Sequence, residues 1–258
     1  MRAMASMYWL PELAWATSAW WDGLARHWRD AGLRDVPEHS QEPKDLYELW
    51  LAPDLFFAQT CGYPLTHDLK GRVTLVATPC YSAPGCAGTD YNSRIIVRED
   101  SGISQLADLA GKVAAINAYD SQSGWNALRH SLTPVLNDAG AFPRIVETGG
   151  HRRSVAAVRE GRADVAAIDC VTFARLSAIV PHEVAGLRVI AETAAAPSLP
   201  YITRKDVSAA DLQRLRDGLK AAIADPTLAD ARQALMIRDV VVLPERAYER
   251  ILEIEAAA

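Results

Sequence analysis

The feature that most constrains the fold is a regular alternation of predicted strands and helices in the middle of the chain. Periodicity and glycine stops predict strands over Lys112–Asn117, Arg144–Glu147 and Asp164–Ile168, with helices over Trp125–Asp138 and His151–Arg159. The loops between these elements are short. This alternation is typical of a mostly parallel sheet covered by helices on both faces, so we predict an α/β fold.

Further elements are predicted on both sides of this region. Upstream, Trp20, Trp21, Leu24 and Trp28 define the apolar face of a helix over Thr17–Ala31. The other upstream predictions are strands over Met4–Leu10, Asp54–Ala58, Val73–Ala77 and Ser93–Arg98, and short helices over Pro43–Trp50 and Ser104–Leu109. Downstream we predict strands over Val189–Ala191 and Tyr201–Thr203, then helices over Ala209–Ala224, Asp225–Met236 and Glu245–Ile254. A chain of 258 residues with this many elements can form two α/β domains.

Charge and hydropathy exclude several classes of partner. The net charge is −5 and no basic run offsets it, which argues against nucleic acid and anionic membranes. No apolar run approaches the roughly 20 residues that span a bilayer, so membrane insertion is not expected. The N-terminal residues lack the apolar core of an export signal, which favours the cytoplasm. The alternative is a periplasmic protein whose leader has been removed.

The sequence shows no sign of a disulfide scaffold, a metal site or a catalytic centre. Cys61, Cys80, Cys86 and Cys170 are too few and too irregularly spaced for a disulfide scaffold, although a bridge between Cys80 and Cys86 stays open. No His/Cys cluster predicts a metal site, and we expect no cofactor. The motifs GxSxG, GxxxxGK[ST], GxGxxG and HExxH are all absent, so we predict that the protein is not an enzyme.

Polar residues gather where the predicted strands end, which is where open α/β sheets bind their ligands. They are Tyr8, Gln59, Thr60, Tyr63, Ser121, Ser123, Asn126, His151, Ser154 and Asp169. Nearly all are neutral hydrogen-bonding groups or aromatics. This profile is typical of a recognition pocket rather than of a catalytic centre.

The segment Asp120–Asn126 is the most informative of these strand ends. It follows a predicted strand and opens a predicted helix, so its backbone N–H groups and the positive helix end can bind an anion. The hydroxyls of Ser121 and Ser123 and a close backbone approach at Gly124 would improve that fit. The alternative is a simple helix N-cap, which uses the same residue types.

A second junction between a strand and a helix repeats the arrangement. His151 follows the turn Gly149–Gly150, and Ser154 lies one helical turn further on the same face. The alternative for His151 is a surface histidine at a helix start. Asp169 ends an apolar strand and can face a cationic part of a ligand or pair with Arg175. Two junctions with matching donors favour a small anionic ligand.

Several segments resemble phosphate/phosphonate substrate-binding proteins of ABC transporters. Gly102–Ala114 resembles the "SLADLKGKRVA" opening of the second lobe, and Ser121–Gly124 resembles the family's Ser/Thr-rich anion loop. Gly150–Asp169 resembles its "GGHxxSxxAVxxGxADVxAxD" block, and Ala196–Asp206 its "PxxPxxxRKD" return strand. The resemblance covers roughly residues 50 to 225.

The resemblance implies a two-lobed type II periplasmic-binding-protein fold. Lobe 1 would comprise residues 1–93 plus 201–258 and lobe 2 residues 94–200, joined by two crossing strands near Ser93–Arg98 and Tyr201–Arg204. The family would hold the anion in the interlobe cleft, on Ser121, Ser123 and His151, with Asp169 at the far end of the ligand. Tyr8, Tyr63 and Tyr91 would be the contribution of the first lobe.

These expectations describe a monomeric binding protein for phosphate, a phosphonate or a similar oxyanion, linked to ABC-type uptake or to sensing. Its partners would be the ligand and an ABC-transporter permease or a signalling protein. The loop reads Ser-Gln-Ser rather than the family's Ser-Thr-Ser, and Asn126 is added, so the ligand stays open. The alternative function is a cytoplasmic enzyme on the same fold, in menaquinone or thiamine-precursor biosynthesis.

Overall fold

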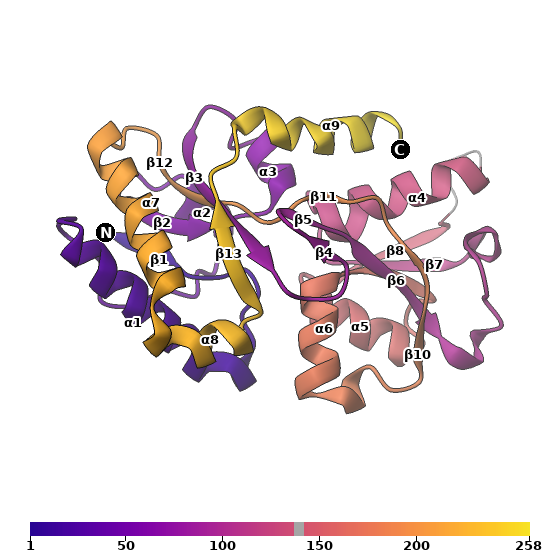
Figure 1. The fold of residues 1–258 in the computed structure, drawn as a ribbon. Coiled ribbons are helices and arrows are strands. Elements are labelled where there is room, and N and C mark those ends of the chain that lie inside the picture. The colour runs from indigo at the N-terminus through magenta and orange to yellow at the C-terminus, as the bar shows by residue number, and fades with distance from the viewer. Residues whose placement is uncertain (137–141) are drawn as a thin grey trace. The chain divides into compact units, whose positions relative to one another are not determined.

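The computed structural model describes residues 1–136 and 142–258 (Figure 1). Over these residues the chain divides into two compact units, and each is assembled from separate stretches of sequence. The first unit contains residues 1–82, 87–89 and 197–247, and the second contains residues 83–86, 90–196 and 248–258. The short strands β4 (Cys86–Ala87), β5 (Asp90–Tyr91) and β11 (Ala196–Pro197) lie where the chain passes between units.

The first unit is built on a five-stranded sheet of order β1-β2-β12-β3-β13. Its strands are β1 (Arg2–Met4), β2 (Leu55–Gln59), β3 (Val73–Tyr81), β12 (Tyr201–Arg204) and β13 (Ile237–Val241). Its helices are α1 (Ala14–Asp30), α2 (Leu46–Trp50), α3 (Gly62–Thr66), α7 (Ala209–Ala224) and α8 (Ala229–Ala234), with 3-10 turns over Pro11–Leu13 and Pro226–Leu228. The pair β1–β2 is parallel, and the other three described pairs are antiparallel.

The second unit has its own five-stranded sheet, of order β10-β6-β9-β7-β8. Its strands are β6 (Ser93–Arg98), β7 (Val113–Ile116), β8 (Arg144–Glu147), β9 (Val165–Asp169) and β10 (Leu187–Glu192). Its helices are α4 (Ala127–Leu136), α5 (His151–Arg159), α6 (Cys170–Ile179) and α9 (Glu249–Ala256). Short 3-10 turns cover Glu99–Ser101, Leu106–Leu109 and Pro181–Glu183, and a π-turn covers Gln122–Asn126. A further 3-10 turn, Glu245–Tyr248, lies where the chain passes from the first unit into the second.

The α/β fold is confirmed, but the prediction of mostly parallel sheets is wrong. In the second unit β7 pairs in parallel with β8 and β9, as consecutive strand–helix–strand units require. Its other two pairings, β6 with β9 and β10 with β6, are antiparallel. The antiparallel strands come from chain segments that lie outside the strand–helix–strand units. Local periodicity does not show which sheet such segments join. The sheets are therefore mixed.

The predicted strand over Met4–Leu10 is also wrong, because β1 ends at Met4. Beyond it the backbone bonds to side chains instead of to a neighbouring strand. The Met7 N–H donates to the Gln59 side-chain oxygen at 2.9 Å, and the Tyr8 N–H donates to the Ser6 hydroxyl at 3.0 Å. These bonds replace the strand pairing that the apolar sequence predicts.

The predicted first helix is confirmed as α1, and it anchors the core of the first unit. Trp20, Trp21 and Trp28 are almost completely buried. Trp28 packs on Phe57 with ring centroids 4.8 Å apart, and its indole N–H donates to the Leu215 carbonyl in α7 at 3.0 Å. In Figure 1, α1 and α7 lie side by side on this unit. The tryptophan stripe thus joins the N-terminal helix to a helix from the far end of the chain.

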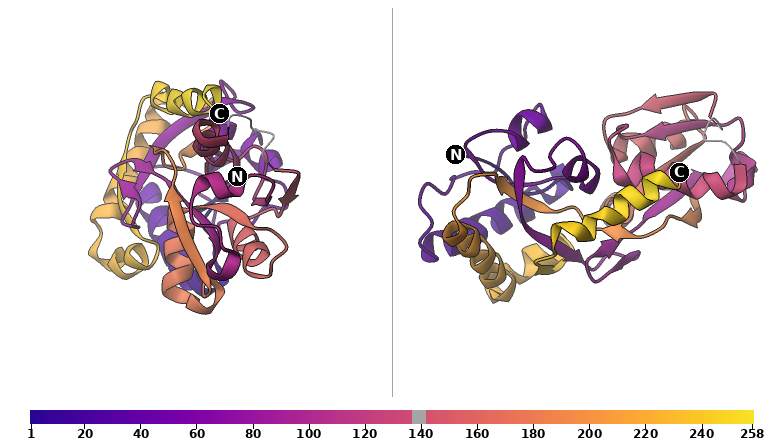
Figure 2. Two further views of the ribbon diagram at one scale, coloured as in Figure 1. Left: turned by 90° about the vertical axis from the view of Figure 1, so that its right-hand side faces the viewer. Right: turned by 90° about the horizontal axis from the view of Figure 1, so that it is seen from above.

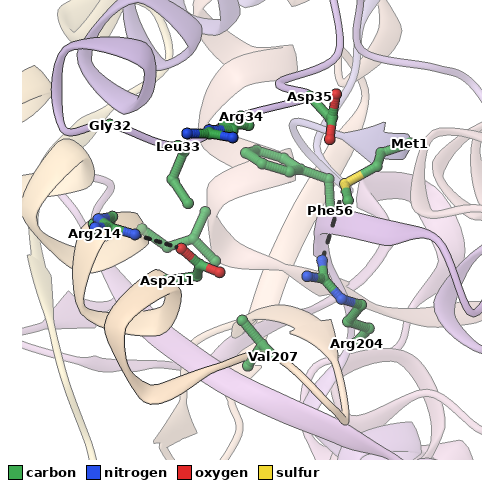
Figure 3. Close-up of a pocket in the computed structure, with 11 residues that line it drawn as sticks. Met1, Gly32, Leu33, Arg34, Asp35, Phe56, Arg204, Val207, Asp211 and Arg214 are labelled. Carbon is green, nitrogen blue, oxygen red and sulfur yellow. Dashed lines mark hydrogen bonds and ion pairs between the residues drawn. The ribbon is translucent and has the colours of Figure 1, made fainter.

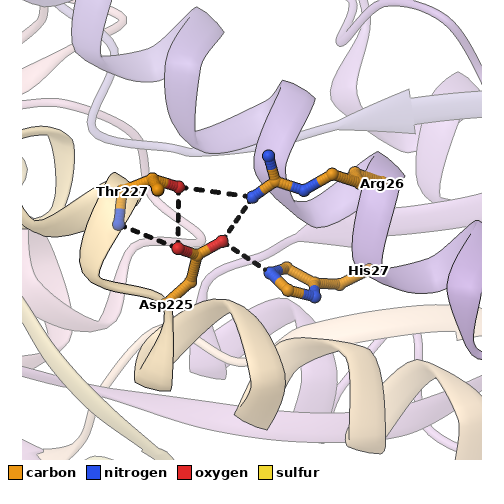
Figure 4. A network of polar contacts seen from close by, with 4 residues as sticks. All are labelled: Arg26, His27, Asp225 and Thr227. Carbon is orange, nitrogen blue, oxygen red and sulfur yellow. Dashed lines mark hydrogen bonds and ion pairs between the residues drawn. The ribbon is translucent and has the colours of Figure 1, made fainter.

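A polar network reinforces the same junction (Figure 4). The Asp225 carboxylate accepts hydrogen bonds from the backbone N–H and the hydroxyl of Thr227, at 2.8 and 2.7 Å. His27 lies 2.9 Å away, and Arg26 also pairs with this carboxylate. The bonds from Thr227, followed by His27, hold the pKa of Asp225 well below its usual value. Asp225 therefore ties α1 to the turn before α8.

The C-terminal helix α9 belongs to the second unit, whereas the family resemblance implies that these residues belong to the first lobe. Ile251 and Ile254 are completely buried, and the Asn126 amide donates to the Ile251 carbonyl at 3.2 Å. Figure 2 shows the yellow C-terminal helix beside the pink part of the chain, where it contacts α4. The predicted end of α4 at Asp138 and its stop at Gly140 lie outside the described residues.

Candidate functional site

Three parallel strands of the second unit end at one edge of its sheet, and polar residues follow each of them. Asn117 follows β7, Thr148 follows β8, and Asp169 ends β9. Because ligands of open α/β sheets bind at the carboxyl ends of such strands, this edge is the candidate site. We call Asn117, Ser123, Gly124, Thr148 and His151 the strand-end cluster.

A hydrogen bond between Ser123 and His151 joins the two predicted anion-binding junctions. The Ser123 hydroxyl and the His151 Nε2 are 2.9 Å apart. Ser123 is held from the other side as well, because the Ser93 hydroxyl donates to its carbonyl at 2.9 Å. The structure therefore brings these two residues together within this unit, and their shared role in ligand binding stays a prediction.

The imidazole of His151 is neutral over most of the pH range. Its removal from water lowers the pKa from 6.5 to about 4, and the backbone of Ala167 acts weakly in the opposite direction. A neutral ring has one N–H and one acceptor nitrogen. When Nε2 carries the hydrogen, the ring donates to Ser123, and the serine hydroxyl hydrogen is then available to another acceptor.

Gly124 allows a close approach that any other residue would prevent. A Cβ atom at this position would lie 1.8 Å from the Asn117 Oδ1 and 3.3 Å from the His151 Cε1. The Asn117 Oδ1 is buried and has no hydrogen-bond partner among the described residues. The close backbone approach predicted at Gly124 is therefore an approach to Asn117 and His151.

Asn117 and Thr148 are not among the site residues predicted from the sequence. Thr148 shares a 2.8 Å hydrogen bond with Ser154, and its hydroxyl also contacts the Ile116 carbonyl at 2.9 Å. Asn117 and Thr148 stand directly at the ends of strands. Their position at the strand ends is the sequence feature from which a site role could have been predicted.

Other predicted residues of this unit serve the local structure. Ser121 takes the capping role, since its hydroxyl accepts from the Gly124 N–H at 3.0 Å. Asn126 is fully buried and donates to the Gln122 side chain at 2.7 Å as well as to α9. Asp169 caps α6 by accepting from the Val171 and Thr172 N–H groups. Ser154 is fully buried beneath Thr148. A ligand role for these four residues stays a prediction.

The remaining predicted residues divide between the two units. Gln59 is fully buried and binds Tyr81 and the Leu199 carbonyl, at 2.9 and 3.1 Å. Thr60 is fully buried next to it, and Tyr8 packs edge-on against Tyr81. Tyr63 stacks on His67 at 3.9 Å. The first unit holds these four residues, whereas Tyr91, expected in the first lobe, belongs to the second unit.

The first unit also contains a pocket of about 400 Å³ between the end of α1 and the start of α7 (Figure 3). Its walls include Arg34, Arg204 and Arg214, and Arg214 pairs with Asp211 at 2.8 Å. Phe56 contributes apolar surface. None of the site residues predicted in this unit lines the pocket, so it is separate from them.

The described residues offer neither a metal-binding cluster nor a membrane-spanning helix. Within residues 1–136 and 142–258, no three His, Cys, Asp or Glu side chains are grouped so that they could hold a metal ion. In the same two ranges, no helix combines the length and apolar character needed to cross a membrane.

Comparisons with known proteins agree with this architecture. A family model described as "ABC transporter, phosphonate, periplasmic substrate-binding protein" matches residues 53–243. No curated protein matches the sequence. Among solved structures, a binding-protein component of an ABC phosphonate transporter from Pseudomonas aeruginosa is 18% identical, with a TM-score of 0.78, covering 99% of this chain and 85% of that one.

Two further structures share the fold. PhnD1 from Prochlorococcus marinus, solved with methylphosphonate, is 14% identical, with a TM-score of 0.77 and coverage of 98% of this chain and 95% of that one. XAC2383 from Xanthomonas citri, solved with ATP, is 20% identical, with a TM-score of 0.72 and coverage of 99% and 94%. At these identities the similarity establishes the fold, which is that of the two-lobed periplasmic binding proteins.

Proposed function

Because this chain belongs to the family of periplasmic substrate-binding proteins of phosphonate ABC transporters, we propose that it captures a small oxyanion-bearing ligand at the strand-end cluster. The ligand class is phosphate, a phosphonate or a similar molecule. The protein binds this ligand and releases it unchanged. Binding serves ABC-type uptake in the periplasm, and the permease of such a transporter is the protein partner.

The hydrogen bond between Ser123 and His151 carries this proposal. In the tautomer with hydrogen on Nε2, the imidazole supports the serine oxygen while the serine hydroxyl donates to the ligand. An oxyanion beside the ring would raise the pKa of His151 from its low value, because an adjacent negative charge favours the imidazolium. The site then acquires its positive charge together with the ligand.

The site suits a small anion for a second reason. Gly124 brings the backbone close to Asn117 and His151 without an intervening side chain. The related PhnD1 was solved with methylphosphonate and XAC2383 with ATP, and both ligands carry phosphorus oxyanions. These observations support the ligand class. The ligand roles predicted for Tyr8, Gln59, Thr60 and Tyr63 of the first unit stay predictions.

Calorimetric titration with phosphate, methylphosphonate and sulfate tests the proposal. We expect at least one of these anions to bind saturably, and Ser123→Ala and His151→Asn each to weaken binding by about 10- to 100-fold, the range of a hydrogen bond to a charged group. Ser177→Ala, on an exposed part of α6, is the matched control and should bind as the parent protein does. Unchanged affinity in both site variants would contradict the assignment.

A further inference from the structure

Two cysteines far apart in sequence have adjoining thiols in the second unit. The Sγ atoms of Cys86 and Cys170 are 3.5 Å apart, although 84 positions separate the residues. Both are free thiols in the structure. A disulfide needs about 2.05 Å between its sulfurs, so the two side chains would have to move by less than the length of one covalent bond.

The backbone holds these thiols together. Gly85 adopts a φ of +101°, and a Cβ atom there would lie 2.4 Å from the Asn92 side chain and 3.0 Å from the Cys170 Cβ. The Cys170 N–H donates to the Asn92 carbonyl at 3.1 Å. Since only glycine tolerates both this φ and this approach, the turn before Cys86 is built close against the start of α6.

We propose that Cys86 and Cys170 form a redox-controlled disulfide, with a disulfide-bearing molecule as the oxidant. This inference does not depend on the proposed ligand. It concerns the segment that leads out of the second unit after Cys86 and the residue that directly follows Asp169 at the end of β9. The bond would close a loop of more than 80 residues and fix that segment to α6.

The two cysteines differ in their exposure to solvent, and this difference decides which thiol reacts first with the oxidant. Cys86 is half-buried, whereas Cys170 is almost completely buried. The hydrogen bond to Cys86, burial and the charge of Asp169 all raise the pKa of the Cys170 thiol. Cys86 therefore reacts first with the oxidant, and Cys170 completes the exchange.

The Cys86–Cys170 disulfide would form by two successive thiol–disulfide exchange steps. Cys86 loses its proton, and its sulfur attacks one sulfur of an oxidant R–S–S–R, so that the oxidant's S–S bond breaks and one RS⁻ leaves. Cys170 then loses its proton and attacks the Cys86 sulfur, which expels the second RS⁻. The two thiolates take up the two protons. The pair of cysteines is oxidised by two electrons, and R–S–S–R is reduced to two RSH.

Incubation of the whole protein in glutathione buffers of graded oxidised fraction tests the proposal. Peptide mapping without reduction should find Cys86 linked to Cys170, and the intact protein should lose the mass of two hydrogen atoms. The melting temperature should rise by about 5–10 °C on oxidation, because the unfolded chain becomes constrained, and fall again on reduction. Cys86→Ser should fold and show no such rise.

The other two cysteines provide the control. The double variant Cys61→Ser with Cys80→Ser should keep both the cross-linked peptide and the temperature shift, since neither residue takes part. The proposal would be overturned by a peptide that links Cys86 to Cys80. Thiols at positions 86 and 170 that stay reduced in the most oxidising buffer would overturn it equally.

Discussion

His151 combines desolvation of its ring with a side-chain hydrogen bond at the start of a helix. Its ring is removed from water, which lowers its pKa to about 4, and its Nε2 contacts a serine hydroxyl at 2.9 Å. A surface histidine in the first turn would keep its hydration and an ordinary pKa. The geometry thus argues against the alternative of a surface histidine at a helix start, and the predicted anion-binding role of His151 stays a prediction.

This desolvation makes folding stability depend on pH. In the unfolded chain His151 titrates with its ordinary pKa of 6.5, whereas in the folded protein it titrates near 4. Between these values the unfolded state binds more protons, so the free energy of unfolding falls as the pH is lowered from 6.5 towards 4. The loss from this residue should reach at most about 3 kcal/mol.

The measurement compares the parent protein with His151→Asn by urea unfolding at several pH values. The difference between their free energies of unfolding should change in favour of the variant as the pH falls from about 7 to about 5. His182→Asn, on an exposed turn, is the matched control. A constant difference between His151→Asn and the parent over this interval would show that the ring is not desolvated.

Single residues also mark the limit of prediction from sequence. The strand-end rule selected Ser123 and His151, which the structure brings into contact, while their role in ligand binding stays a prediction. It could not tell that Asn126 bonds to the Ile251 carbonyl or that Ser154 lies beneath Thr148. Those bonds depend on tertiary neighbours, whereas residue type and strand position depend on local sequence alone.

At the scale of elements, strong periodicity gave accurate boundaries. The predicted bounds of α5, α7, β6 and β8 agree with the structure. Several elements were missed, among them α3, α6 and β13. In α6 the sequence Cys170–Ile179 is apolar without a clear polar face, and β13 directly follows a segment predicted as helix. Pairing direction could not be predicted either, because it depends on which chain segments meet in one sheet.

Close packing of α1 against α7 yields a prediction at the same scale. A Cβ atom at Gly218 would lie 2.3 Å from Trp28 Cδ1, and Trp28 is completely buried. Alanine in an unhindered helix position stabilises by up to about 1 kcal/mol relative to glycine. Here we expect the clash to prevail, so that Gly218→Ala lowers the free energy of unfolding by about 1–3 kcal/mol.

Chemical denaturation followed by tryptophan fluorescence measures this change. Lys220→Ala, on an exposed position of the same helix, should differ from the parent by no more than about 0.5 kcal/mol. If Gly218→Ala were instead as stable as the parent or more stable, Trp28 would have room to move, and the tight junction between the two helices would not hold.

At the scale of the whole molecule, both compact units are discontinuous in sequence. Residues 197–247 belong to the first unit, although they follow most of the second unit in the sequence. Residues 248–258 belong again to the second unit. Each unit nevertheless has its own five-stranded sheet and its own buried residues. Local unfolding of one unit should therefore be separable from that of the other.

The C-terminal helix offers the test of this separation. Ile251 is completely buried in α9, so Ile251→Ala should destabilise the second unit by about 2–4 kcal/mol, the range for a large-to-small change in a core. Hydrogen exchange should show faster opening of amides in β7 and β9, with those in β2 and β12 unchanged. Glu253→Ala, exposed on the same helix, is the control. Equal loss of protection in all four strands would mean that the two units open as one, and that the C-terminal residues stabilise the entire chain rather than the unit they complete.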